Sequence, residues 1–461
     1  MPIVGTLILP HPPILIPSIG KGEEHHAAAT ENAYLKAAEL VQSLAPDTIV
    51  ICSPHAESYS DYFQIADGQV GIGSFAKFGA KDYNFRVLYD TELVSAIEGL
   101  ALEEGFPAGS EGGEAPDLDH GTMVPLYFIN KKFRSYRIVR IASSGLSLFD
   151  HYRMGKIIAK ASASLDRKVL FVASGDMSHC QKINGPYGYR DEGPAYDEQL
   201  LNVLGKADFP SLFTFDTTLL SEAKECGHRS FVMMAGFLDG LAVEPKLLSH
   251  EAPFGVGYGV MSFIPKGNDP KRLFGDIFLS QEKEKCQKKL SQADDVVKLA
   301  HNSLLSYLTT GKVLKVPSDI DTSLKDNKAG VFVSIHHFGS LRGCIGTIEP
   351  TKQSVAMEII ANAIEAGTED PRFPSIKLEE MPYLEFSVDV LSPIEHILSS
   401  KELDPHKYGV VVSSGSQKGL LLPNLEGVES VEQQIDIARR KAGISPDAFL
   451  SLDRFSVKRH S

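Results

Sequence analysis

The sequence predicts an α/β domain with a central, mostly parallel sheet covered by helices, followed by a smaller α+β domain. Short continuous apolar runs alternate with helical patterns over the first 265 residues. Continuous apolar runs are typical of strands buried on both faces, as in parallel sheets. The composition then changes, and the length of 461 residues suggests roughly two to four domains.

Four apolar runs in residues 1–265 are predicted to be strands. They are Val4–Leu9, Asp47–Cys52, Tyr136–Ile141 and Val169–Ala173. The segment Ala27–Leu44 has helical spacing and residues that favour helix. Because strands and helices alternate along the chain, we expect one α/β domain over residues 1–265.

A linker is predicted over residues 266–281, where the segment PKGNDPKR carries two prolines, a glycine and several charges. The second domain, residues 282–461, mixes helices and strands in a pattern typical of α+β folds. Its predicted helices and strands are Gln281–Thr309 (helix), Val331–His336 (strand), Ser354–Ala366 (helix), Leu384–Leu391 (strand) and Val431–Ala442 (helix).

Charge and cysteine content exclude several classes of protein. The net charge of −13 argues against a nucleic-acid or acidic-membrane binder, because phosphate binding needs a cationic field. The five cysteines are odd in number and none are spaced as CxxC, which argues against a disulfide framework or a structural zinc site. With no signal peptide and no apolar stretch of membrane-spanning length, we expect a cytoplasmic protein.

Two histidines follow the first two predicted strands at corresponding places. His11 comes just after the first strand and His55 just after the second. Ligands of open parallel sheets bind beyond the carboxyl ends of the strands, so the two imidazoles can converge on one metal there. Glu225 precedes the apolar segment Ser230–Leu238, where the start of a helix would favour its negative charge. Two histidines and one carboxylate form the facial donor set of non-haem iron(II) enzymes.

Other polar residues of the first domain leave alternatives open. Taken alone, a histidine in a loop is usually a satisfied polar residue, and only the set points to a metal. Asp176 either orients a neighbouring histidine or caps a helix. His228 and Arg229 either bind an anionic group of a substrate or pair with surface acids.

Five short motifs in order carry a resemblance to a known family. The motifs are HPP at 11–13, SPH at 53–55, DHG at 119–121, SGDMSH at 174–179 and ECGHR at 225–229. Together they resemble the LigB-type class III extradiol dioxygenases and the Memo-like proteins that share their fold. The resemblance covers about residues 1–265.

The resemblance implies site residues and a reaction. It implies that His11, His55 and Glu225 hold iron(II), that His179 is the general acid/base, and that His120 lies in the second sphere. Memo-like proteins carry a cysteine near the carboxylate position, which makes Cys226 the alternative third ligand. A thiolate there would favour zinc or a different iron chemistry.

In the second domain, the segment LRGCIG places Arg342 two residues before Cys344. An arginine nearby can activate a cysteine, although free cysteine is often a small buried residue instead. LRGCIG, EDPRFP at 369–374, FSVDVLSP at 386–393 and KGLLLP at 418–423 resemble the AMMECR-type domain. This resemblance implies a compact α+β domain with a cleft holding Arg342 and Cys344. Asp370 and Arg372 either join that cleft or tie its turn together.

The combination of the two domains resembles the AmmeMemoRadiSam system, which implies a radical SAM enzyme as a partner protein. We therefore expect an iron(II)-dependent oxidoreductase, similar to extradiol dioxygenases, that acts on a small catechol-like substrate and carries an accessory AMMECR-type domain. The alternatives are a metal-dependent hydrolase or lyase, and a metal-binding adaptor that works with the radical enzyme. Whether the chain forms a homo-oligomer is left open.

Overall fold

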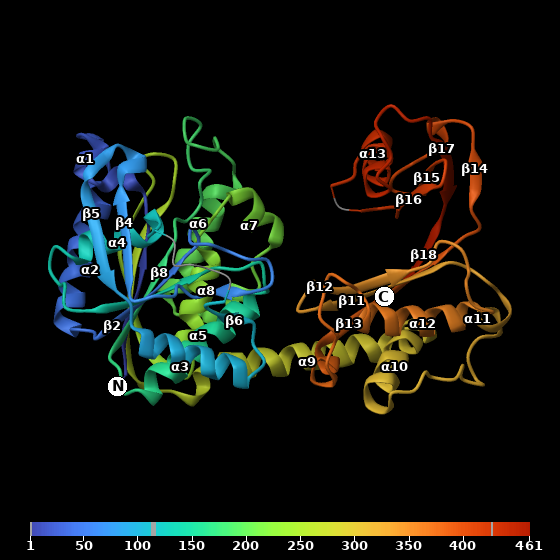
Figure 1. The fold of residues 1–461 in the computed structure, drawn as a ribbon, viewed down its shortest axis with the longest axis horizontal. Helices are drawn as coiled ribbons and strands as arrows, with labels where there is room; N and C mark the ends of the chain where they lie inside the picture. The colour runs from blue at the N-terminus through green and yellow to red at the C-terminus, as the bar shows by residue number, and fades with distance from the viewer. Residues whose placement is uncertain (1, 112–116, 426) are drawn as a thin grey trace. The chain divides into compact units, whose positions relative to one another are not determined.

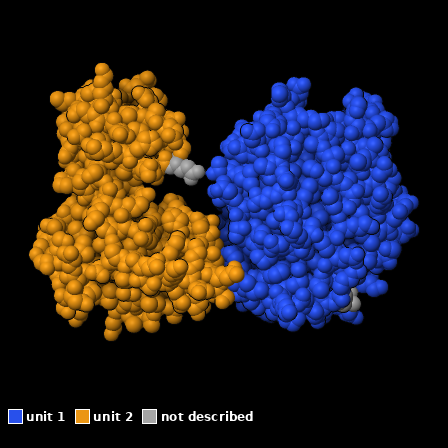
Figure 2. All heavy atoms as spheres, turned by 180° about the vertical axis from the view of Figure 1, so that it is seen from behind, with its two compact units in different colours: residues 1–278 blue, residues 279–461 orange. Residues whose placement is uncertain are grey.

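The computed structural model describes residues 2–111, 117–425 and 427–461. The chain divides into two compact units, Met1–Phe278 (unit 1) and Leu279–Ser461 (unit 2), which Figure 2 shows in separate colours. Across these described ranges, the longest helices are too polar, and the apolar ones too short, to cross a bilayer. The predicted division into two parts is therefore present, with its boundary at residues 278 and 279.

Unit 1 is built on a six-stranded sheet with the strand order β7-β2-β8-β1-β10-β9. The first four strands in that order are parallel, and β10 and β9 form an antiparallel hairpin at one edge. The strands are β1 (Ile3–Leu9), β2 (Thr48–Ser53), β7 (Arg137–Ala142), β8 (Val169–Ser174), β9 (Leu241–Glu251) and β10 (Tyr258–Asn268). All four predicted strands are present, and the prediction of a mostly parallel sheet is confirmed.

Helices cover both faces of this sheet (Figure 1). Alternate side chains of each strand point to opposite faces, so Leu170 and Val172 of β8 join the core beneath α2 (Ala28–Leu44) and α4 (His120–Ile129). Phe171, between them, packs against Phe237 of α8 (His228–Phe237), with ring centroids 5.3 Å apart. Since both faces are buried, the central strands β2 and β8 contain only buried residues, which explains their continuous apolar runs.

The remaining helices and strands of unit 1 lie outside the main sheet and are joined by connecting segments. The hairpin β4–β5 precedes α3, and two connections, residues 175–191 and 224–227, lead into α6 and α8. The other elements are α1 (Pro17–Gly20), β3 (Phe63–Gln64), β4 (Val70–Phe75), β5 (Ala80–Leu88), α3 (Thr91–Glu103), β6 (Ala108–Gly109), α5 (Leu148–Ser164), α6 (Glu192–Gly205) and α7 (Thr217–Ala223).

Unit 2 contains two antiparallel four-stranded sheets, each with its own core and helices. The sheet β12-β11-β13-β18 packs against α10 and α12, and the sheet β14-β17-β15-β16 packs against α13. The α+β prediction for this unit is therefore confirmed. Its elements are α10 (Asp295–Thr310), α11 (Thr322–Asp326), β11 (Val331–His337), β12 (Ser340–Gly346), α12 (Val355–Thr368), β13 (Leu384–Leu391), β14 (Glu395–Ile397), β15 (Gly409–Ser414), β16 (Gln417–Leu421), α13 (Val431–Lys441), β17 (Ser451–Phe455) and β18 (Val457–His460).

The segment predicted as a linker, residues 266–281, is ordered secondary structure. It forms the end of β10, a 3-10 turn at Pro270–Arg272 and the first part of helix α9 (Phe274–Gln292). The side chain of Asp269 accepts a hydrogen bond from the Lys271 amide, and Pro270 occupies the first position of the turn. Proline here therefore marks a tight turn from strand to helix, whereas Gly267 lies within β10, and the segment is not a flexible connection.

The single helix predicted over residues 281–309 is two helices, α9 and α10. Between them, the carboxylate of Asp294 accepts hydrogen bonds from the amides of Val296 and Val297. By accepting from these amides, the Asp294 side chain caps the start of a new helix. The pattern of helix-favouring residues therefore continues along the sequence, although the chain forms two separate helices.

A buried histidine makes the stability of unit 1 depend on pH. His151 of α5 is 0% exposed, donates from Nδ1 to the Ser147 carbonyl and accepts from the Ser144 amide at Nε2. Burial lowers its pKa from 6.5 to about 3. In the unfolded chain this histidine takes up a proton near pH 6.5, whereas in the folded chain it does not until about pH 3. Its stabilising contribution is therefore complete above pH 6.5 and is lost as the pH falls through this window.

We expect this residue to lower the free energy of unfolding of unit 1 by roughly 3 kcal/mol between about pH 6.5 and 4. Urea denaturation over this range, on the wild type and His151→Leu, measures the slope of stability against pH. The slope should be shallower in the variant, whatever its absolute stability. Equal slopes would show that His151 is not held neutral.

Candidate metal centre

The centre lies at the carboxyl ends of three neighbouring parallel strands. In the ladder β2-β8-β1, Leu9 pairs with Ser174 and Cys52 pairs with Ala173, so the three strands end at the same level. His11 and His55 each follow two residues after the last residue of their strand. Their Nε2 atoms lie 3.0 Å apart, so the structure brings the two imidazoles to one point.

The hydrogen bonds of His11 set its tautomer. The Ser174 hydroxyl donates to the Gly121 carbonyl at 2.6 Å, so it must accept from Nδ1 of His11, which lies 2.9 Å away. This leaves the lone pair of His11 Nε2 pointing toward His55. Burial lowers the pKa of His11 to about 4, and the ring is therefore neutral at pH 7, as a metal ligand must be.

Cys226, and not Glu225, lies close enough to both imidazoles to be the third candidate donor. The Cys226 sulfur lies 3.6 Å from His11 Nε2, and the ligand atoms of His11, His55 and Cys226 all lie within 4.8 Å of one another. Glu225 Oε2 instead accepts a hydrogen bond from the amide of His228, at 2.6 Å, where helix α8 begins. The start of the helix thus does attract the carboxylate, and this capping contact leaves Glu225 outside the group of His11, His55 and Cys226.

Two glycines allow the segment of Cys226 to approach the end of β8. A Cβ atom added to Gly175 would lie 2.3 Å from the Cα of Gly227, so the two backbones touch. Next to this contact, the amide of Asp176 lies 3.3 Å from the Cys226 sulfur and donates to it. The glycines of the SGD and ECG motifs are therefore required for the position of the thiol.

The electrostatics of the centre suit a cation. Burial lowers the pKa of His55 and of His120, so these imidazoles are also neutral at pH 7. Burial, together with Asp176 and Glu225, raises the pKa of the Cys226 thiol well above its ordinary value. The thiol therefore keeps its proton until a cation stabilises the thiolate, and metal binding would release that proton.

His179 lies beside these donors and is poised to hold a proton. Its Nδ1 donates to the Lys224 carbonyl, and its Nε2 lies 3.7 Å from a carboxylate oxygen of Asp176. Burial alone would lower the pKa of His179, but the nearby Asp176 carboxylate and the hydrogen bond to the Lys224 carbonyl outweigh burial and raise it. Asp176 also accepts from the amide of His11 at 2.8 Å. Because no described helix begins next to it, Asp176 orients histidines and is not a helix cap.

His120 is the first residue of α4 and lies against both candidate ligands. Its ring centroid is 4.2 Å from that of His55 and 5.3 Å from that of His11. The preceding Asp119 accepts from the Ser53 hydroxyl at 2.6 Å and from the Thr122 amide at 3.0 Å, which caps the helix. The His120 ring therefore lies next to His11 and His55 but is not part of the group formed by His11, His55 and Cys226.

The suggested substrate-binding role does not fit His228. This residue is 0% exposed, and its Nε2 donates to the Leu212 carbonyl at 2.9 Å while Nδ1 accepts from the Tyr196 hydroxyl. Both ring nitrogens are therefore already used inside the core. Arg229 donates to the Leu146 carbonyl, and Glu225 raises its pKa against the lowering by burial. Both side chains are therefore engaged by the protein itself at the start of α8.

In unit 2, the residues singled out from the LRGCIG and EDPRFP motifs bind one another. Arg342 forms two hydrogen bonds with Glu380, at 2.9 and 3.1 Å. The buried carboxylate of Asp370 accepts from the Cys344 amide at 2.8 Å and from Arg372, and these hydrogen bonds, led by Arg372, lower its pKa to about 2. Asp370 and Arg372 thus tie the turn together, and both also contact the backbone of Cys344.

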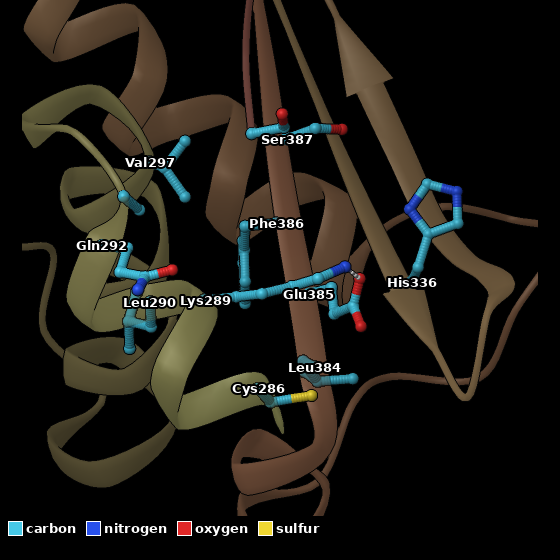
Figure 3. Close-up of a pocket in the computed structure, with 12 residues that line it drawn as sticks. Cys286, Lys289, Leu290, Gln292, Val297, His336, Leu384, Glu385, Phe386 and Ser387 are labelled. Atoms are coloured by element: carbon cyan, nitrogen blue, oxygen red, sulfur yellow. Dashed lines mark hydrogen bonds and ion pairs between the residues drawn. The ribbon is translucent and has the colours of Figure 1, made fainter. Parts of the chain in front are cut away.

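Sequence patterns missed a second group in unit 2. A cavity of about 270 Å³ lies between α9 and β13 and is lined by Cys286, Lys289, His336 and Glu385, among others (Figure 3). Glu282, Cys286 and Glu385 have ligand atoms within 4.8 Å of one another. Lys289 lies 2.6 Å from Glu385, however, and already balances its charge. Spacing on the helix relates Glu282 to Cys286, but only the fold brings Glu385 to them.

Comparison with known proteins assigns both units to families. Residues 5–261 match the family described as the catalytic LigB subunit of aromatic ring-opening dioxygenase, and residues 297–460 match AMMECR1. The chain is 42% identical to protein CA_C1420 of Clostridium acetobutylicum over 468 aligned residues, which cover 100% of this chain and 99% of that protein.

Two further similarities each cover about a third of the chain. A protein of Thermotoga maritima is 46% identical over 166 residues, which cover 36% of this chain and 95% of that protein. The crystal structure of protein PH0010 from Pyrococcus horikoshii aligns at 33% identity with a TM-score of 0.34, over 36% of this chain and 88% of that one. The LigB match spans more than half of the chain and includes all the donors of the centre. The chain therefore belongs to the family of the catalytic LigB subunit of aromatic ring-opening dioxygenases, with an AMMECR1 domain in the same polypeptide.

Proposed function

We propose that unit 1 is a metal-dependent oxidoreductase of the extradiol dioxygenase type that acts on a small catechol-like substrate. The observation that carries this proposal is the convergence of His11, His55 and Cys226 at the strand ends, beside a histidine that can hold a proton. Iron(II) is the metal we propose, because family membership favours dioxygenase chemistry.

The donor set fits a metal with open coordination positions. Two neutral imidazole nitrogens and one sulfur come from three different segments, and the His11 lone pair already points to the common centre. Three protein ligands leave positions free on a metal for small molecules. Glu225, our first choice from the sequence, is held by the His228 amide and would act on the site only through its charge.

Bound iron(II) would supply adjacent positions for a catecholate and for dioxygen. The protein's own part is to bind the substrate and to move its protons. His179 would take the proton of a substrate hydroxyl at Nε2, since Nδ1 is committed to the Lys224 carbonyl. Asp176 stabilises the resulting imidazolium from 3.7 Å. His120, next to His55, would hydrogen-bond a substrate oxygen and so orient the ring.

The thiol supports a second candidate function. Cysteine and histidine together are typical ligands of zinc, and zinc lowers the pKa of a bound water to about 7. With zinc in the same place, the centre would serve a hydrolase or lyase, and His179 would again be the group that carries the proton. The two candidates differ in whether dioxygen is consumed.

The metal content of variants tests the ligand assignment. We expect His11→Ala, His55→Ala and Cys226→Ser each to weaken metal binding by at least about 10-fold, because each removes a direct donor. Protein purified without oxygen and analysed by plasma mass spectrometry gives the metal content. Glu225→Gln and Cys344→Ser, a thiol of unit 2, are the controls and should keep it. Loss with Glu225→Gln but not with Cys226→Ser would return the carboxylate as the ligand.

Oxygen uptake with catechol tests the reaction. We expect iron-loaded wild type to consume dioxygen, and His179→Gln to lower the rate by about 100- to 10,000-fold with its metal content unchanged, since it loses the proton carrier. The exposed His26→Gln is the matched control and should behave as wild type. If iron-loaded protein consumes no dioxygen with a panel of catechols, the dioxygenase proposal fails, and activity restored by zinc would favour hydrolysis or elimination.

A further inference from the structure

The loop of residues 181–189 follows His179 and is anchored at its base. Gln181 donates its amide to the Gly255 carbonyl at 3.0 Å and bridges to Tyr189 across the loop. A Cβ atom added to Gly255 would lie 2.6 Å from the Cα of Gly185, so the two backbones are in contact. Gly255 and Gly185 therefore allow the close backbone contact that holds this loop in place.

Tyr187 of this loop contacts His179 and is itself largely exposed to solvent. Its ring centroid is 5.7 Å from that of His179, at an interplanar angle of 48°. The residue is nevertheless 59% exposed. A tyrosine that contributes mainly to a core would be buried, so this one borders the site on its solvent side.

Phe78 has the equivalent position on a different element. It ends the 3-10 turn Ala76–Phe78 at the tip of the β4–β5 hairpin, and it packs edge-on against His120 with centroids 5.5 Å apart. Its exposed fraction is 39%. The following Gly79 has a φ of +89°, a conformation that favours glycine and turns the chain back into β5. Two exposed aromatic rings thus contact the two histidines that are not metal donors.

From this arrangement we propose that Tyr187 and Phe78 form an aromatic rim that binds the planar ring of the substrate and selects aromatic over saturated diols. The inference rests on the proposed function and adds two substrate-contacting residues to it. His179 and His120 act on the substrate's oxygens, and the ring attached to those oxygens must extend toward the solvent side of the two histidines. Aromatic pairs contribute about 0.5–1.5 kcal/mol each beyond the area they bury, enough to discriminate between a flat and a puckered ring.

Calorimetric titration of the metal-loaded full chain with two probes tests the rim. The probes are catechol and cis-cyclohexane-1,2-diol, which offer two neighbouring hydroxyl groups on a flat and on a puckered ring. We expect Tyr187→Ala and Phe78→Ala each to weaken catechol binding by about 2- to 10-fold and to leave cyclohexanediol binding unchanged. Tyr187→Phe, which keeps the ring, should bind catechol like wild type. Ile183→Ala is the control from the same loop, since Ile183 is 83% exposed.

The outcomes separate this inference from the function it rests on. Unchanged catechol binding in both alanine variants, an equal loss for both probes, or no binding of catechol by the wild type would each overturn the rim. Metal content and oxygen uptake of the same samples decide the proposed function independently. Suppose that the wild type keeps its metal and consumes dioxygen, and that Tyr187→Ala and Phe78→Ala bind catechol as the wild type does. This result would support the proposed metal centre and contradict the aromatic rim.

Discussion

The parallel pairing of β2, β8 and β1 is the constraint on which the rest of the centre depends. Parallel strands in register end together, and here each of the two outer strands carries a histidine two residues beyond its end. β8 lies between them, and the segment that follows it carries Asp176 and His179. Asp176 accepts a hydrogen bond from the amide of His11 and lies 3.7 Å from Nε2 of His179, three residues further along the same segment. The sheet supplies rigid positions and the loops supply the chemistry.

The centre also depends on polar groups that are buried but satisfied. Ser174, Asp119 and Asp176 are held by backbone amides, by a carbonyl or by other hydroxyls, and each fixes the orientation of a histidine. Unpaired buried polar groups would be costly, so this network has few alternative arrangements. Close contact of Gly175 with Gly227 completes it by placing the Cys226 sulfur beside the Asp176 amide. The same use of glycine at Gly185 and Gly255 supports the loop that carries Tyr187.

In unit 2, the motif residues serve the fold. Arg342 and Arg372 are paired with Glu380 and Asp370, and the Cys344 amide donates to Asp370, so these polar residues tie β12 to the turn after α12. The group around Cys286 is of a different kind, since it lines a cavity whose carboxylate is neutralised by lysine. A charge that is already balanced gains less from a cation. The metal chemistry that we propose is therefore confined to unit 1.

Local patterns in the sequence determined the four parallel strands, the helix α2 and the α+β character of unit 2. They also determined that His11 and His55 follow strands. Apolar periodicity and turn residues act over short distances, so the sequence alone is enough for these features. Only the tertiary structure shows that Cys226, and not Glu225, lies in one group with His11 and His55. The side chains of adjacent residues point in different directions. The amide of His228 donates to the Glu225 carboxylate, whereas the contact between Gly175 and Gly227 places the Cys226 thiol near His11. The tertiary structure also decided that His228 is buried in the core, that residues 266–281 form a turn and a helix, and that Phe78 and Tyr187 reach the site. These outcomes depend on contacts between segments far apart in the chain, and short-range patterns carry no information about them.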